Sequence, residues 1–161
     1  MKITVLTAAA LLALTPAAFA ASETFSADLK PSAEVPAVDS KASGTITATY
    51  DTASKKLTYT ATYKDLSGPA TMAHFHGPAA PSQNANILVD ISPAHSPLGS
   101  PKHGCVPFTK DQAKLLSKGL VYINVHSTMF TGGEIRGQVL PTKVKYTKVP
   151  APASPSGAFL E

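Results

Sequence analysis

Hydrophobic and polar residues alternate along most of the chain in short runs, each bounded by residues that favour turns. An alternation with a period of two is typical of β-strands with one buried face, whereas an amphipathic helix repeats its apolar positions every three to four residues. The pattern therefore predicts about seven strands. They span residues 24–29, 44–50, 56–63, 71–76, 87–91, 120–126 and 134–140.

The second and third of these runs form the clearest pair. Ile46, Ala48 and Tyr50 share one side of the second run, and threonines occupy its other side. Residues 51–55, with the sequence DTASK, supply turn formers between the two runs and predict an antiparallel hairpin. About seven short strands with little helix predict an all-β domain, either a two-sheet sandwich or a Greek-key barrel.

Two segments between the fifth and sixth runs depart from the alternation. Residues 92–107 contain four prolines and two glycines, which predicts a long irregular loop. Residues 109–112 fit a capping box, and two leucines followed by Gly119 predict one short helix over residues 110–118. Because the loop and the helix connect strands of the sheet, we expect them to cover its outer face.

The two ends of the chain differ from the domain between them. Residues 1–20 carry a lysine at position 2, followed by an apolar stretch of about a dozen residues, and they end on Ala-Phe-Ala. This layout predicts a cleaved secretory signal peptide. That stretch is shorter than the roughly twenty residues of a membrane span, so no stable membrane anchor is expected. A bacterial periplasmic or secreted location follows. The domain is expected over residues 21–140, and the Pro- and Lys-rich residues 141–161 are expected to be flexible.

The amino-acid composition excludes several kinds of function for this protein. The 161 residues carry a formal charge of +4, but 13 of the 14 basic residues are scattered lysines and the only arginine is Arg136. Proteins that bind nucleic acids concentrate basic residues on one face, so no nucleic-acid partner is expected. The single cysteine, Cys105, excludes an internal disulfide, a CxxC redox pair and a multi-cysteine zinc site. The five histidines are the remaining candidates for chemistry.

Three histidines are predicted to share one face of the sheet. Strand side chains alternate, so His74 and His76 point the same way, away from Phe75. The same counting places His126 opposite the valines and isoleucine of its run, and places Arg136 on the polar side of the last run. If the apolar residues fill the interior, the three histidines and the arginine project from the outer face.

An H-x-H pair on one strand is suited to chelation, because its imidazoles start roughly 7 Å apart and can converge on one ion. His126 from a neighbouring strand completes a set of three, and His95 and His103 in the proline-rich loop are candidates for a fourth ligand. Histidine ligands without a cysteine-rich or carboxylate-rich set favour copper, with zinc as the alternative. The same histidines also fit a metal-free polar surface, and Arg136 fits either a structural pair or an anion site.

Three ordered motifs resemble the CHRD domain family. They are AHFHGPA at residues 73–79, LVYINVHS at 120–127 and GGEIRGQ at 132–138, and the likeness extends over about residues 24–140. The family has a distant likeness to copper/zinc superoxide dismutases. The resemblance therefore implies an immunoglobulin-like, Greek-key sandwich or barrel of about seven to eight strands with one short helix.

The resemblance also implies a function. By analogy with the dismutases, His74, His76 and His126 would be copper ligands, and Arg136 would be a catalytic residue that guides superoxide to the metal. The chain departs from the dismutases at Cys105, which has no disulfide partner. One interpretation is an exported copper-dependent superoxide dismutase. The alternatives are a periplasmic metal-buffering protein without turnover and a metal-free module that binds a protein partner.

Overall fold

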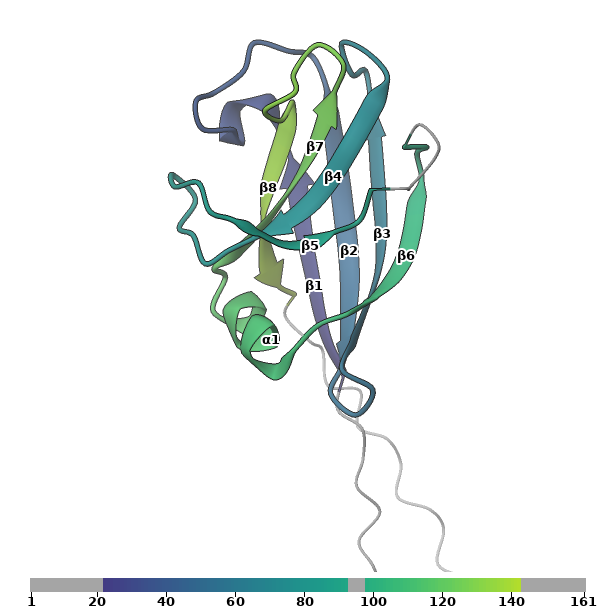
Figure 1. Cartoon of the computed structure of the whole chain (residues 1–161), viewed down its shortest axis with the longest axis vertical. Helices are drawn as coiled ribbons and strands as arrows, with labels where there is room; N and C mark the ends of the chain where they lie inside the picture. The colour runs from purple at the N-terminus through teal and green to yellow at the C-terminus, as the bar shows by residue number, and fades with distance from the viewer. Residues whose placement is uncertain (1–21, 93–97, 143–161) are drawn as a thin grey trace, which may run out of the picture.

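The computed structural model describes residues 22–92 and 98–142, so the predicted signal peptide and residues 143–161 of the predicted tail lie outside the described residues. The described residues form eight strands, one short 3-10 helix and one α-helix (Figure 1). No helix in these two ranges is long and apolar enough to span a membrane. The elements are β1 (Ser22–Leu29), η1 (Pro31–Ala33), β2 (Ser43–Asp51), β3 (Lys56–Lys64), β4 (Ala70–His76), β5 (Ile87–Asp90), β6 (Lys102–Pro107), α1 (Lys110–Ser117), β7 (Val121–Ser127) and β8 (Ile135–Pro141).

The strands form a single antiparallel sheet in the order β5-β4-β7-β8-β1-β2-β3-β6, curled until it nearly closes into a barrel (Figure 1). Strands β1, β2 and β3 follow one another as neighbours, whereas the connections β3 to β4, β5 to β6 and β6 to β7 cross between the two halves of the sheet. Long connections of this kind belong to the Greek-key class. The predicted all-β fold with one short helix is confirmed.

The β2–β3 hairpin forms as the alternation predicts. Ile46 lies opposite Ala61 across the pair, and both side chains are buried. At the turn, the carboxylate of Asp51 accepts hydrogen bonds from two backbone N–H groups, at 2.8 Å each. The side chain of Asp51 thereby satisfies backbone donors that the strand ladder leaves unpaired.

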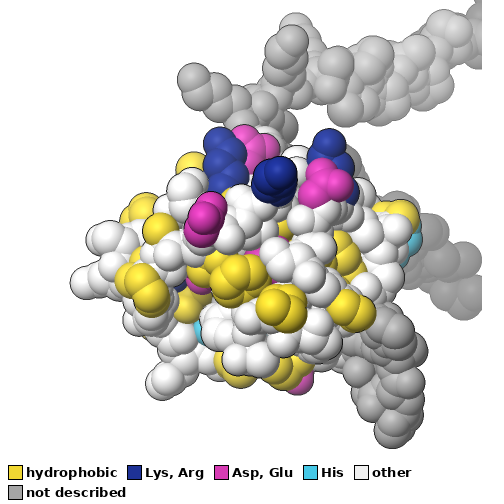
Figure 2. Space-filling view, turned by 90° about the horizontal axis from the view of Figure 1, so that it is seen from above, with side chains coloured by type: hydrophobic (Ala, Val, Ile, Leu, Met, Phe, Trp, Pro, Cys, Tyr) yellow, Lys and Arg dark blue, Asp and Glu magenta, His cyan; other side chains and the backbone are white. Residues whose placement is uncertain are grey.

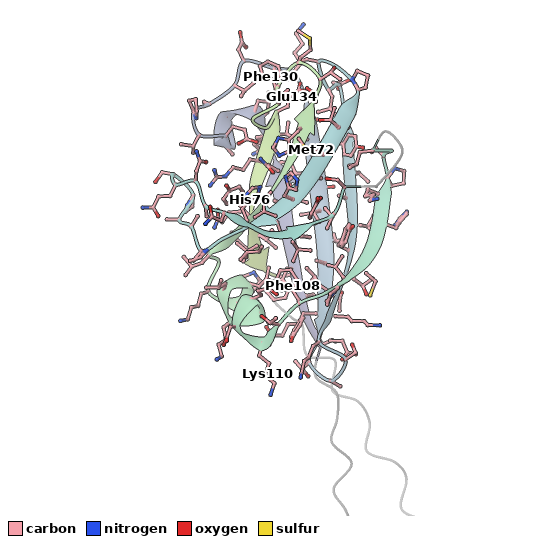
Figure 3. All side chains as sticks on the ribbon, in the orientation of Figure 1. Met72, His76, Phe108, Lys110, Phe130 and Glu134 are labelled. Carbon is pink, nitrogen blue, oxygen red and sulfur yellow. The ribbon has the colours of Figure 1, made fainter. Side chains whose placement is uncertain are left out.

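The barrel interior holds the apolar side chains of the alternating pattern. Phe75 is fully buried and contacts the rings of Tyr59 and Phe108 edge-on, with centroids 5.8 and 5.9 Å apart. Leu116 of α1 is also fully buried in this core. Helix α1 therefore closes one end of the barrel, next to Phe108 (Figure 3).

The prediction of an irregular loop over residues 92–107 is wrong for its last part, because β6 forms there and pairs with β3. Prolines lack the N–H that a strand ladder needs, but Pro101 precedes β6 and Pro107 is its last residue. The residues between these two prolines keep the backbone N–H groups that a strand ladder needs. Strand β6 lies at one end of the sheet order, the position in which a neighbouring proline is tolerated.

Candidate metal site

The three histidines of β4 and β7 form one cluster, as predicted. Strands β4 and β7 are hydrogen-bonded neighbours, with His74 opposite Asn124 and Met72 opposite His126. One nitrogen from each imidazole of His74, His76 and His126 lies within 4.8 Å of the other two. Because Phe75 between the two β4 histidines points into the core, the cluster lies on the outer face of the barrel.

The cluster is nevertheless buried. His74, His76 and His126 are only 5%, 9% and 7% exposed. On the face of the molecule that Figure 2 shows, histidine side chains appear only as small patches. The ring of His76 stacks on Tyr122, with centroids 4.7 Å apart, and the carbonyl oxygens of Ala85 and Thr131 contact ring nitrogens of His76 and His126. The expectation that the proline-rich loop and α1 cover this face is wrong for α1, because the helix packs into the end of the barrel instead.

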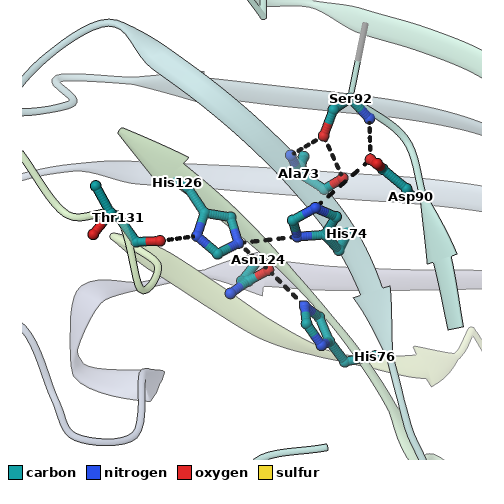
Figure 4. A network of polar contacts seen from close by, with 8 residues as sticks. All are labelled: Ala73, His74, His76, Asp90, Ser92, Asn124, His126 and Thr131. Atoms are coloured by element: carbon teal, nitrogen blue, oxygen red, sulfur yellow. Dashed lines mark hydrogen bonds and ion pairs between the residues drawn. The ribbon is translucent and has the colours of Figure 1, made fainter. Parts of the chain in front are cut away.

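Each ring has one nitrogen directed at a fixed acceptor, and Figure 4 shows the acceptors of His74 and His126. His76 Nδ1 lies 3.0 Å from the carbonyl oxygen of Ala85, and His126 Nδ1 lies 2.8 Å from that of Thr131. A carbonyl has no hydrogen to give, so both Nδ1 atoms donate, and in a neutral ring each Nε2 then carries a lone pair.

In His74 the roles of the two nitrogens are exchanged, so that Nε2 faces the oxygen partner and Nδ1 faces the cluster. Its Nε2 lies 3.6 Å from the Asp90 carboxylate on β5, and its Nδ1 lies 3.0 Å from His126 Nε2. Histidines that bind metals usually direct their second nitrogen at a carbonyl or carboxylate, which fixes the ring and raises its basicity. All three histidines have such a partner. The sequence analysis missed Asp90, whose position opposite His74 in the register depends on the β4–β5 pairing.

Burial favours the neutral form of two of the rings, His74 and His126. It lowers the pKa of His74, and the neighbouring His126 lowers that pKa further. Burial likewise lowers the pKa of His126. Neutral imidazoles with free lone pairs are the form that coordinates an ion.

Of the two predicted fourth ligands, His103 does not join this cluster, and the prediction for His95 is not tested. His103 is exposed on β6, and its Nδ1 lies 3.0 Å from the Thr60 hydroxyl on β3. His95 lies outside the described residues. Asn124 of β7 is 3% exposed, and its Oδ1 lies 3.1 Å from Nε2 of both His76 and His126.

Arg136 is on the same face as the cluster but is 1% exposed. Its guanidinium donates to Asn84 Oδ1 at 2.9 Å and to the carbonyl oxygens of Gln83 and Pro81 at 2.6 and 3.3 Å. It also lies 3.4 Å from the ring centroid of Tyr122. The arginine thus holds residues 81–84 against the barrel. Guiding an anion would require this segment to move away.

Glu34 is a buried carboxyl group that the sequence analysis did not single out. It is 8% exposed, and its Oε1 has no hydrogen-bond partner among the described residues. Burial raises the pKa of Glu34 to about 7, although the charge of Arg136 acts in the opposite direction. A lone acidic residue in the largely apolar segment PSAEVPAV was the available signal.

Glu34 is expected to make the metal-free protein less stable as pH rises. Its folded pKa lies above its ordinary value of 4.5, so the folded state holds a proton that the unfolded chain releases between pH 4.5 and about 7. Wild type should lose up to roughly 3 kcal/mol of stability through this window. Glu34→Gln removes the loss, so it should be the more stable protein at pH 8 in urea unfolding with a chelator present.

The control is Glu23→Gln, which removes an exposed carboxylate on β1. Histidine titration affects wild type and both variants alike, so the pH dependence of the difference between proteins isolates the carboxyl group. If the Glu34→Gln difference stays constant from pH 4 to pH 8, Glu34 is not protonated in the folded state near neutral pH.

The comparisons with known proteins agree with the motifs. A family model described as the CHRD domain matches residues 25–139, which is most of the chain and nearly all of the described structure. No curated protein and no solved structure shows significant similarity to the chain.

Proposed function

The chain belongs to the CHRD domain family, and we propose that it is an exported copper-binding protein that holds the ion between His74, His76 and His126. The observation that carries the proposal is the convergence of three imidazole nitrogens on one region of the outer face. The second nitrogen of each ring faces a carbonyl or carboxylate oxygen. Export rests on the features of residues 1–20.

The donor set fits copper or zinc. Three neutral imidazoles without a thiolate suit either metal, whereas the oxygen-rich sites of calcium and magnesium need carboxylates that this cluster lacks among the described residues. Copper, when bound, supplies one-electron redox chemistry. The protein's own contribution is to fix the rings through Ala85, Thr131 and Asp90 and to exclude bulk water from them.

Two uses of the ion follow from the surroundings of the cluster. Superoxide dismutase-like turnover requires a small anion to reach the ion, with Arg136 as its guide. Metal buffering or delivery requires only binding and release. The second use is favoured by one observation, which is that the guanidinium of Arg136 is already occupied by residues 81–84.

The test is to titrate the purified chain with Cu(II) or Zn(II), count bound ions by native mass spectrometry and then measure superoxide consumption. One copper per chain is the expected result. Superoxide consumption by the loaded protein would support dismutase-like activity, and its absence together with ready transfer to a chelator would support buffering. If neither metal binds, the proposal fails and the histidine face belongs to a metal-free interaction module.

A further inference from the structure

We infer that Asn124 is a fourth ligand of the proposed ion, through its side-chain oxygen, so that the site has three nitrogens and one oxygen. The inference rests on the proposed metal function and adds a residue that the H-x-H motif does not predict. Asn124 lies on β7, two residues before His126, so both side chains are on the same face of the strand.

Three separations between the candidate ligand atoms are those expected of atoms that share an ion. Asn124 Oδ1 lies 3.1 Å from His76 Nε2 and 3.1 Å from His126 Nε2. His126 Nε2 in turn lies 3.0 Å from His74 Nδ1. Two ligands bound about 2.0 to 2.1 Å from one metal are roughly 2.9 to 3.4 Å apart when the angle between them lies between a right angle and the tetrahedral angle.

The chemistry of these atoms also calls for a cation. Nε2 of His76 and Nε2 of His126 carry lone pairs, because the Nδ1 atoms of these two rings donate to backbone carbonyls. The side-chain oxygen of Asn124 likewise carries only lone pairs. Three acceptors directed at one another repel, unless a positive charge lies between them. The cluster is buried, so water does not screen this repulsion fully.

The surroundings of the Asn124 amide nitrogen, Nδ2, are consistent with an orientation in which Oδ1 faces the histidines. A Cβ atom added to Gly133 would collide with Glu34 Oε1 and would lie 2.7 Å from Asn124 Nδ2, so the carboxyl group and the amide nitrogen border the same small space. An oxygen of Glu34 that carries no proton attracts the NH₂ group and repels the amide oxygen. Glu34 therefore favours the orientation in which Oδ1 faces the histidines.

An oxygen ligand would decide which form of the metal the site prefers. Amide oxygen is a hard donor, which suits Cu(II) and Zn(II), whereas Cu(I) prefers soft sulfur. The site would then hold oxidised copper more tightly than a site with a thioether in the fourth position. Met72 and Met129 are 38% and 68% exposed, far more than the three buried histidines.

Asn124→Leu and Asn124→Asp test the inference by Cu(II) affinity, measured by chelator competition, and by the electron paramagnetic resonance spectrum of the loaded protein. The leucine variant should bind Cu(II) at least about tenfold more weakly than wild type, and its spectrum should change. The aspartate variant keeps the shape and supplies an oxygen, so it should restore the affinity or exceed it. A residue that only donates hydrogen bonds to the rings would not be replaced by aspartate.

Gln138→Leu is the matched control, because it removes another side-chain amide from the outer face of the same sheet. Gln138 Nε2 donates to the carbonyl oxygens of Ala79 and Gly119 and forms no hydrogen bond with a histidine in the described part of the chain. This variant should lose stability but keep its Cu(II) affinity and spectrum.

The outcomes separate the inference from the function on which it rests. If wild type binds no copper, the proposed metal function and the assignment of Asn124 as a ligand both fail. If wild type binds copper and Asn124→Leu matches it in affinity and spectrum, the three-histidine site stands and the fourth ligand is wrong. If the leucine variant does not fold, Asn124→Asp decides, because an unchanged copper spectrum after a carboxylate replaces the amide would overturn the inference.

Discussion

The double variant His74→Ala, His126→Ala is expected to lose Cu(II) and Zn(II) binding, with an affinity more than about a thousandfold below that of wild type. Complete zinc sites contribute roughly 10 to 16 kcal/mol of apparent binding free energy, and this variant removes two of the three imidazoles. The remaining His76 cannot chelate alone. Any superoxide consumption by the loaded protein should disappear with the metal.

His103→Ala is the matched control for this experiment, since it removes an exposed histidine on β6 that lies outside the cluster. It should bind metal as wild type does. Circular dichroism shows whether each variant folds, because loss of a fold would also abolish binding. Undiminished metal affinity in a folded double variant would falsify the three-histidine site.

Arg136→Met is expected to destabilise the protein by roughly 3 kcal/mol and to release residues 81–84 from the barrel. Methionine keeps much of the length of arginine but leaves Asn84 Oδ1 and the carbonyl oxygens of Gln83 and Pro81 without their donor. Hydrogen bonds to charged groups are among the stronger ones, and unpaired buried acceptors add a further cost. Urea unfolding and hydrogen exchange of the segment measure the two effects.

Arg136→Lys distinguishes the two roles that the sequence leaves open. Lysine keeps the positive charge but cannot reproduce the planar fork of donors. If Arg136 mainly holds the segment, lysine should destabilise nearly as much as methionine, whereas an anion guide would tolerate lysine with little loss of stability. Lys110→Met, which removes an exposed charge on α1, controls for the change in net charge (Figure 3).

Local sequence rules predict the strands and the position of the histidines because these features depend on neighbouring residues. The alternation around Phe75 decides that His74 and His76 share the face opposite the core. The capping box at Thr109 and Gln112 and the positive φ of Gly119 likewise form as predicted at the two ends of α1. Each of these features needs only a few consecutive residues.

The loop predictions were less successful because loops depend on distant partners. The prolines of residues 92–107 predict irregular structure, yet β6 forms where β3 offers an unpaired edge. The assignment of α1 to the histidine face was wrong for a similar reason. A short amphipathic helix packs wherever an apolar opening is available, and here that opening is the end of the barrel.

The all-β fold, the family and the shared face of the three histidines follow from strand periodicity and motif spacing, which are local properties of the chain. The surroundings of those histidines depend on the tertiary fold. Ala85 and Thr131 fix two of the rings, Asn124 lies between them, and residues 81–84 occupy Arg136. These contacts join segments distant in the chain, so only the pairing of the strands and the packing of the loops on them bring the groups together.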